Sequence, residues 1–258
     1  MKPDKVLIIG LGQLGLPAAK YVREKGFETY GYDTSIKAIE RAEKTAGIKT
    51  AYDFRDFDIY IICISTHASE DMFSPNIEGV LSIADRISKE AKKDGALVSI
   101  ESTVPKGTSR KVFELLNHRL HVVHAPHRWY ALEEKEHGVN QLRVIGGVSD
   151  CCLKAGMLFY NGSKDGYAID EHQEEIYSTA TQTSYHHGLD IPMHTVSNAE
   201  IAETTKVVEN AHRYLQIAFA EELYLYCQEN NMSFSELRDA LNTKWNVDIL
   251  EHDSQGRE

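Results

Sequence analysis

A glycine-rich stretch near the amino end constrains this chain more than any other feature. The aliphatic residues 6–9 lead into residues 10–15, and residues 16–19 suit a helix. In a G-x-G-x-x-G spacing, one glycine makes a tight turn, one lets the backbone approach a pyrophosphate, and one allows the helix to pack closely on the strand. The N–H groups at the helix start favour an anion. The predicted cofactor contacts are Gly10, Gly12, Gln13, Leu14 and Gly15.

An acidic residue after the second apolar run indicates which dinucleotide is bound. Asp33 follows residues 28–32, close to the roughly 20-residue separation expected for a ribose-binding carboxylate. This carboxylate accepts hydrogen bonds from a 2′-hydroxyl and repels a 2′-phosphate, and neither Thr34 nor Ser35 is an arginine that would offset the repulsion. The pattern favours NAD over NADP, and Lys37 is the nearby cation that could weaken this preference.

Composition limits the compartment and the partners. The chain has 258 residues, enough for a large α/β domain and a smaller one. Its net charge of −11 argues against nucleic acid or an anionic membrane as the main partner. Four cysteines, two of them adjacent, form no disulfide framework, and residues 6–19 are too short and too glycine-broken to span a bilayer. We expect a soluble, cytoplasmic protein.

The order of apolar runs predicts an α/β fold. From Lys5 to about Gly147, short β-rich runs alternate with helical stretches, which is typical of a Rossmann-type, doubly wound, mainly parallel sheet. The predicted strands are residues 5–9, 28–32, 59–64, 97–100, 121–124 and 143–146, and the predicted helices start after Gly12, at Ser35, near Pro75 and at Thr108.

The carboxyl-terminal part reads as helical. Residues 149–159 suit a helix, whereas the polar residues 161–190 are either an insertion or a pair of short helices. Ser197 or Asn198 is expected to cap a long helix that ends near Glu229, with apolar residues on several faces. Ser233 and Glu236 form a capping-box pattern for a further helix to Leu241. We predict a NAD-binding domain (1–160), a polar linker (161–196) and a helical segment (197–258) that forms a homodimer.

Two groups of polar residues suit hydride-transfer chemistry. Lys206 and Asn210 are four residues apart, so one helix face presents an ammonium and a carboxamide that can stabilise an oxyanion and hold a water. A solvated surface lysine beside an unrelated asparagine is the alternative. Thr103 lies in the turn of residues 101–108, at the sheet edge where a cofactor binds, although an ordinary strand-to-helix loop has similar residues.

Six ordered motifs carry a family resemblance. They are residues 10–17 (GLGQLGLP), 62–66 (ICIST), 102–108 (STVPKGT), 125–128 (APHR), 144–147 (VIGG) and 199–210, which include Lys206 and Asn210. In this order the chain resembles the UDP-glucose/GDP-mannose dehydrogenase family, which oxidises a nucleotide sugar twice at C6 with NAD. The resemblance implies that Thr66 and Thr103 lie beside the nicotinamide, and that Lys206 and Asn210 position water and stabilise the oxyanion.

The chain departs from this family at two points. His127 replaces the glutamate of the family's Pro-Glu-Arg motif, and it could act as a base or merely fill space. The family's nucleophilic cysteine, in a Gly-Gly-x-Cys loop, and its second nucleotide-type domain would both follow Glu258. We therefore expect that this chain does not complete the two-step oxidation unaided. The alternatives are a compact NAD-dependent hydroxyacid dehydrogenase and a non-catalytic dinucleotide-binding protein.

The histidines do not suggest a metal centre by their spacing. His121, His124 and His127 are three apart, which on a strand places neighbours on opposite faces. His186 and His187 have no zinc-type Cys/His spacing nearby. The sequence predicts no metal, and it predicts structural roles for all four cysteines.

Overall fold

The computed structural model describes residues 4–67, 74–129, 138–162 and 188–249. Most of the polar stretch 161–190 lies outside the described residues. The chain divides into two compact units, Met1–Thr205 and Lys206–Glu258, and each is described here by itself.

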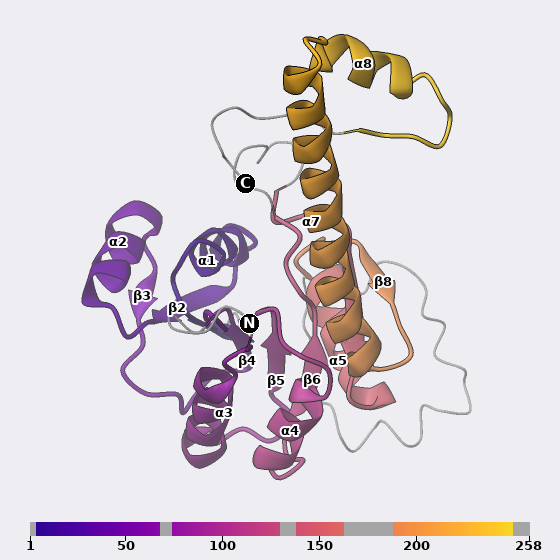
Figure 1. Ribbon diagram of the computed structural model, residues 1–258. Coiled ribbons are helices and arrows are strands. Elements are labelled where there is room, and N and C mark those ends of the chain that lie inside the picture. Colours follow the sequence, from indigo (N-terminus) through magenta and orange to yellow (C-terminus); the bar gives the residue numbers. More distant parts are fainter. Residues whose placement is uncertain (1–3, 68–73, 130–137, 163–187, 250–258) are drawn as a thin grey trace. The chain divides into compact units, whose positions relative to one another are not determined.

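The first unit is built on one twisted sheet, which confirms the predicted doubly wound fold (Figure 1). Its strands are β1 (Lys5–Ile9), β2 (Glu28–Tyr32), β3 (Lys49–Thr50), β4 (Ile59–Ile62), β5 (Leu97–Ile100), β6 (His121–His124), β7 (Arg143–Gly147) and β8 (Met193–Thr195). They lie in the order β3-β2-β1-β4-β5-β6-β7-β8. All neighbouring pairs are parallel except β6 and β7. From β1 the chain adds β2 and β3 on one side of the sheet and then crosses to add β4 and β5 on the other side. Sheets of this kind bind ligands at the point between β1 and β4 where the strand order reverses.

Helices cover both faces of this sheet. They are α1 (Gly15–Glu24), α2 (Ile36–Ala46), α3 (Glu78–Glu90), α4 (Thr108–Leu115) and α5 (Asp150–Asn161). Side chains alternate along β1, so Val6 and Ile8 join the core under α1, α2 and α5, whereas Leu7 and Ile9 join the core under α3 and α4. Burial on both faces explains why the strands read as continuous apolar runs.

Element ends differ from the predictions by a few residues. The fourth strand ends at Ile62 rather than at residue 64, because Cys63 makes the last ladder bond, to Ile9, and the Ile64 carbonyl oxygen accepts from the Ser102 hydroxyl. The sequence reading missed β3 and β8, edge strands of two and three residues that are too short to show alternation. Strand β8 lies within the range predicted as a linker and pairs with β7.

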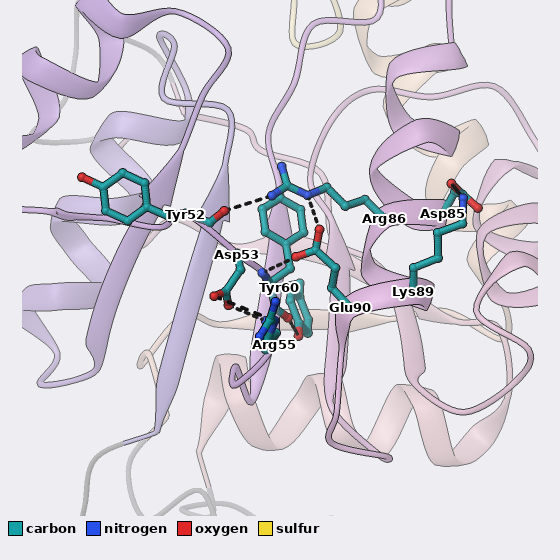
Figure 2. Close-up of polar contacts among 9 residues, drawn as sticks. Tyr52, Asp53, Arg55, Tyr60, Asp85, Arg86, Lys89 and Glu90 are labelled. Carbon is teal, nitrogen blue, oxygen red and sulfur yellow. Dashed lines mark hydrogen bonds and ion pairs between the residues drawn. The ribbon is translucent and has the colours of Figure 1, made fainter.

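The loop between β3 and β4 is fixed to α3. Figure 2 shows Arg86 donating to the Tyr52 carbonyl oxygen (3.2 Å) and to the Glu90 carboxylate (2.8 Å). Glu90 in turn accepts from the Phe54 backbone N–H at 2.8 Å. The guanidinium lies 4.0 Å from the Phe54 ring centroid and 4.8 Å from that of Tyr32. These contacts hold the carboxyl end of β2 in place.

The start of the long helix α7 (Ala199–Glu229) belongs to the first unit. The Asn198 side chain accepts from the Ile201 backbone N–H at 2.9 Å, so it caps this helix as predicted. Glu200 forms an ion pair with Arg110 of α4 at 2.9 Å. Among the described residues, no helix is long and apolar enough to cross a membrane.

The second unit contains the rest of α7 and α8 (Phe234–Leu241). Ser233 caps α8 through the Glu236 backbone N–H at 3.3 Å, as the capping-box pattern predicts. The rings of Tyr224 and Phe234 pack edge to face, 5.7 Å between centroids. A stripe of apolar side chains along α7 is exposed, consisting of Val208, Leu215, Phe219 and Tyr226.

Candidate active site

The glycine loop between β1 and α1 holds its three glycines for different reasons. Gly10 has a φ of +93°, and a Cβ there would lie 2.5 Å from the Cys63 carbonyl oxygen. A Cβ on Gly15 would lie 1.7 Å from the Gly10 carbonyl oxygen. A Cβ on Gly12 would meet nothing within 4 Å. The first and third glycines are therefore required by the backbone itself, and the second leaves open space that fits a close-lying pyrophosphate.

The start of α1 is suited to an anion. Leu14 is the N-cap residue and its side chain makes no capping hydrogen bond. Gly12 and Gln13 are exposed, and Leu14 is half-buried. Because helix N-termini carry partial positive charge and unpaired N–H groups, this uncapped start can take a diphosphate.

Asp33 is held at the end of β2 by two backbone donors. Its Oδ2 accepts from the Leu11 N–H at 2.7 Å, and its Oδ1 accepts from the Ser35 N–H at 2.8 Å. Each carboxylate oxygen has a further lone pair, so both can still accept from ribose hydroxyls. The Asp33 carboxylate is thus fixed beside the glycine loop, in the position that a ribose-binding residue needs.

Arg41 of α2 is a cation near this carboxylate that the sequence reading did not name. Its Nη2 donates to the Leu11 carbonyl oxygen at 2.8 Å, whereas Lys37 is exposed. Leu11 connects the two side chains, because its N–H donates to Asp33 and its carbonyl oxygen accepts from Arg41.

The loops after β4 and β5 lie against each other at the carboxyl end of the sheet. Thr66 is buried, and its hydroxyl donates to the Thr103 carbonyl oxygen at 2.7 Å. Ser102 is also buried, and its hydroxyl donates to the Ile64 carbonyl oxygen at 2.7 Å. The structure therefore brings together Thr66 and Thr103, the two threonines singled out in the sequence.

Glu203, from the second turn of α7, fixes the loop that carries Thr103. The carboxylate is fully buried and accepts from the Gly107 N–H at 2.6 Å and from the Ser109 N–H at 2.7 Å. It also accepts from the Ser109 hydroxyl at 2.6 Å. A carboxylate at the N-terminus of α4 supplies the cap that Gly107 lacks.

A buried polar network lies beneath these loops, centred on Glu101. One carboxylate oxygen forms an ion pair with His127, and the other accepts from the Tyr160 hydroxyl and lies 3.2 Å from Nη1 of Arg143. The Tyr160 oxygen also lies 2.7 Å from the Ser99 hydroxyl. The side chains of Glu101, His127 and Arg143 are at most 2% exposed.

The charges in this network decide its protonation. Burial alone would raise the pKa of Glu101, but His127 and Arg143 outweigh it and hold this pKa at about 2. Burial, followed by the charge of Glu101, raises the pKa of Cys63 well above its ordinary value. Cys63 is therefore a neutral thiol, as expected of a structural cysteine rather than a nucleophile.

Lys206 and Asn210 lie one turn apart on α7, in the second unit. Lys206 is half-buried and Asn210 is exposed. Their shared helix face agrees with the sequence reading, and their role beside a reacting carbon stays a prediction.

The sequence reading gave no role to Glu101, Arg143, Tyr160 or Glu203. A weak signal existed for two of them, because Glu101 and Arg143 are charged residues directly adjoining runs of buried strand residues. A charge in that position needs a partner, although sequence alone does not identify it. Tyr160 and Glu203 lie on helices far along the chain and gave no such signal.

Comparison with known proteins places the chain in a family. Residues 44–163 match the NAD binding domain of the UDP-glucose/GDP-mannose dehydrogenase family, and residues 200–254 match its central domain. NAD is accordingly the cofactor of the first unit, and the open Gly12 and the fixed Asp33 fit it.

Individual relatives agree with this match. The UDP-N-acetyl-D-mannosamine dehydrogenase of Methanococcus maripaludis is 26% identical over 270 residues, which cover 95% of this chain and 56% of that protein. The solved structure of the Pyrococcus horikoshii UDP-D-ManNAc dehydrogenase is 25% identical with a TM-score of 0.69, covering 95% of this chain and 59% of that one. The chain thus spans little more than half the length of these relatives.

A third structure shares the fold alone. The 3-hydroxyisobutyrate dehydrogenase of Mycobacterium tuberculosis has a TM-score of 0.65 at 14% identity, covering 95% of this chain and 72% of that one. The fold is therefore common to sugar and hydroxyacid dehydrogenases. The two matched domain models, in contrast, both belong to the UDP-glucose/GDP-mannose dehydrogenase family. On this evidence the chain belongs to the UDP-glucose/GDP-mannose dehydrogenase family.

Proposed function

We propose that this chain forms the NAD-binding and helical parts of a nucleotide-sugar dehydrogenase. Its substrate is a nucleotide sugar of the UDP-N-acetylmannosamine class, oxidised at a CH–OH group for the synthesis of polysaccharide precursors. The main support is the glycine loop, in which the backbone excludes side chains at Gly10 and Gly15 but leaves Gly12 open beside a fixed Asp33. NAD, when bound, supplies the hydride acceptor.

The chain's own residues then act on the substrate. Thr103 contacts the reacting end from a loop that Thr66 and Glu203 hold in place. The Lys206 ammonium stabilises the oxygen of the reacting carbon as negative charge develops there, and the Asn210 amide holds a water. One face of α7 thus presents both groups, the charged Lys206 and the neutral Asn210.

For His127, the buried ion pair with Glu101 favours a positioning role over the base role considered from sequence. A base must exchange its proton with substrate, and an imidazole at most 2% exposed that is held by a carboxylate is poorly placed to do so. His127 and Glu101 would instead support the loops from below.

The exposed stripe on α7 supports the proposed homodimer. Val208, Leu215, Phe219 and Tyr226 are each more than half exposed and recur at intervals of seven and four residues, as in helix-to-helix seams. A second copy of this chain is the proposed occupant, in the cytoplasm, where NAD is plentiful. Sedimentation of the wild type and of Leu215→Glu tests this proposal, and a monomeric wild type would refute it.

Cofactor choice is tested at Asp33. Calorimetry should show that the wild type takes up NAD and discriminates against NADP. Asp33→Ala should remove most of that discrimination, because the repelling carboxylate is lost while the Arg41 guanidinium remains nearby. Asp53→Ala, in the loop fixed to α3, is a matched control that should leave both affinities unchanged. No uptake of NAD by folded protein would overturn the proposal.

Catalysis is tested at Lys206 with a panel of UDP-sugars and of 2- and 3-hydroxy acids, followed by NADH absorbance. Lys206→Ala should lower turnover roughly 100-fold or more while leaving NAD affinity nearly intact. The exposed Lys111→Ala is the control. Turnover of the hydroxy acids alone would favour a compact hydroxyacid dehydrogenase, and no turnover at all would favour a binding protein.

A further inference from the structure

A cluster of imidazole and thiol groups lies at the amino end of the sheet, away from the glycine loop. His121 is the first residue of β6, and Cys151 and Cys152 lie in the first turn of α5. The His121 imidazole nitrogen and the two sulfurs lie within 4.8 Å of one another. Strand and helix therefore bring three potential metal ligands to one place.

The His121 imidazole has an unsatisfied atom there. His121 is only 9% exposed, and its Nε2 is buried and has no hydrogen-bond partner among the described residues. A buried polar atom left without a partner destabilises the fold, and a bound ligand would supply the missing partner. Burial also lowers the pKa of His121, so its ring is neutral near pH 7 and has a lone pair to offer.

Burial raises the pKa of the Cys152 thiol, and the Ser149 hydroxyl opposes that shift, so it is a bound cation that would remove the thiol proton. The Ser149 hydroxyl lies 3.1 Å from each sulfur. The sulfurs belong to the first turn of α5, where the helix dipole favours negative charge. Cys152 is fully buried, whereas Cys151 is half-buried, so the cluster is open to solvent through Cys151.

A second cluster with metal-binding residue types, Cys63 with Glu101 and His127, shows what excludes a cation. There the Arg143 guanidinium already lies 3.2 Å from the Glu101 carboxylate, and Tyr160 donates to the same oxygen. A metal ion would have to displace a buried positive charge. In the described part of the chain, the side-chain contacts found for Cys151 and Cys152 are to Ser149, and no cationic side chain is among them.

We propose that His121, Cys151 and Cys152 form a binding site for one thiophilic divalent cation of the zinc class. Two thiolates and a neutral imidazole suit this ion, with water in the fourth position. Tetrahedral zinc with bonds of about 2.3 Å to sulfur holds its sulfur ligands roughly 3.8 Å apart, and the three atoms here lie within 4.8 Å of one another.

The proposed ion would tie the start of β6 to the start of α5. Two thiols lose their protons on binding, so about two protons pass to the buffer for each ion bound. The site lies at the opposite end of β6 from the loop that carries His127, so its expected role is structural. This assignment departs from the expectation of no metal that the histidine spacing gave, because Cys151 and Cys152 are distant from His121 in sequence.

The experiment is a Co²⁺ titration of the reduced, metal-free full chain, followed by the thiolate-to-cobalt charge-transfer absorption. We expect one equivalent to bind and Zn²⁺ to displace it. Cys152→Ser and Cys151→Ser should abolish the band, and His121→Gln should weaken binding roughly tenfold or more. The controls Cys227→Ser and His194→Gln should bind as the wild type does.

Alkylation of the wild type tests the site without any variant. Zn²⁺ should protect Cys151 from iodoacetamide, as mapped by peptide mass, and should raise the thermal midpoint. Absence of the charge-transfer band in the wild type, or equal alkylation of Cys151 with and without Zn²⁺, would overturn the proposal. A band that persists in the Cys151→Ser/Cys152→Ser double variant would do the same.

Discussion

The two ends of the sheet carry similar residue types in opposite electrostatic settings. At the carboxyl end, Cys63 and His127 surround a Glu101 carboxylate that two positive groups balance. At the amino end, the cluster of His121 and the adjacent cysteines includes no carboxylate from the residues that the structure describes, and none of those residues bonds to the His121 Nε2. In both clusters the three ligand atoms lie within 4.8 Å of one another, so the difference between the closed network and the proposed ion site is the local charge.

Removing the internal cation should have the largest effect. Arg143→Met would leave Glu101 buried with only His127 as a positive partner, and we expect a loss of roughly 3–5 kcal/mol in the free energy of unfolding. Urea denaturation measures this loss. Arg110→Met, which breaks the more exposed pair with Glu200, should cost less than about 1 kcal/mol. Equal losses in the two variants would contradict the closed network.

Acid should open the same network. The pKa of Glu101 is about 2 in the folded chain, below the ordinary 4.5, so its contribution is complete above about pH 4.5 and is lost as the pH falls toward 2. The contribution is about 3 kcal/mol. The stability difference between wild type and Glu101→Gln, followed by denaturation at each pH, should shrink over that range. A difference independent of pH would show that the carboxylate charge is not what stabilises the fold.

The smallest effect is expected at the amino end. In metal-free protein, His121→Phe should change stability by less than about 1 kcal/mol, because no hydrogen bond to Nε2 is lost and a desolvated polar atom is removed. His127→Phe is the matched substitution at the other end and should cost several times more, since it removes a partner of Glu101. Thermal unfolding of both variants makes the comparison, and a costly His121→Phe would mean that the two clusters do not differ as described.

Most of the fold followed from local pattern. The predicted ranges of β1, β2, β5 and β6 match the observed strands, because buried parallel strands are short aliphatic runs bounded by turn residues. The caps at Asn198 and Ser233 were also predicted, since capping depends on neighbours three residues apart. The antiparallel direction of β7 was not, because pairing direction depends on where distant segments meet.

The candidate site likewise has residues that a local motif predicts and residues that only the folded chain brings together. The glycine loop and Asp33 belong to a compact motif with fixed spacing, so sequence was enough to name them. Glu101, Arg143 and Tyr160 come from a strand end, a strand start and a helix, and no spacing links them. Burial, which decides their charges, is a property of the folded chain and not of its local sequence.

The unequal surroundings of Gly12 and Gly15 separate folding from ligand capture. A methyl group on Gly15 collides with the Gly10 carbonyl oxygen, whereas one on Gly12 meets only open space. Substitution of Gly12 by alanine would therefore yield an intact sheet whose diphosphate seat is obstructed. A single mutation at Gly12 would therefore remove cofactor binding, and with it redox activity, while the protein stays folded.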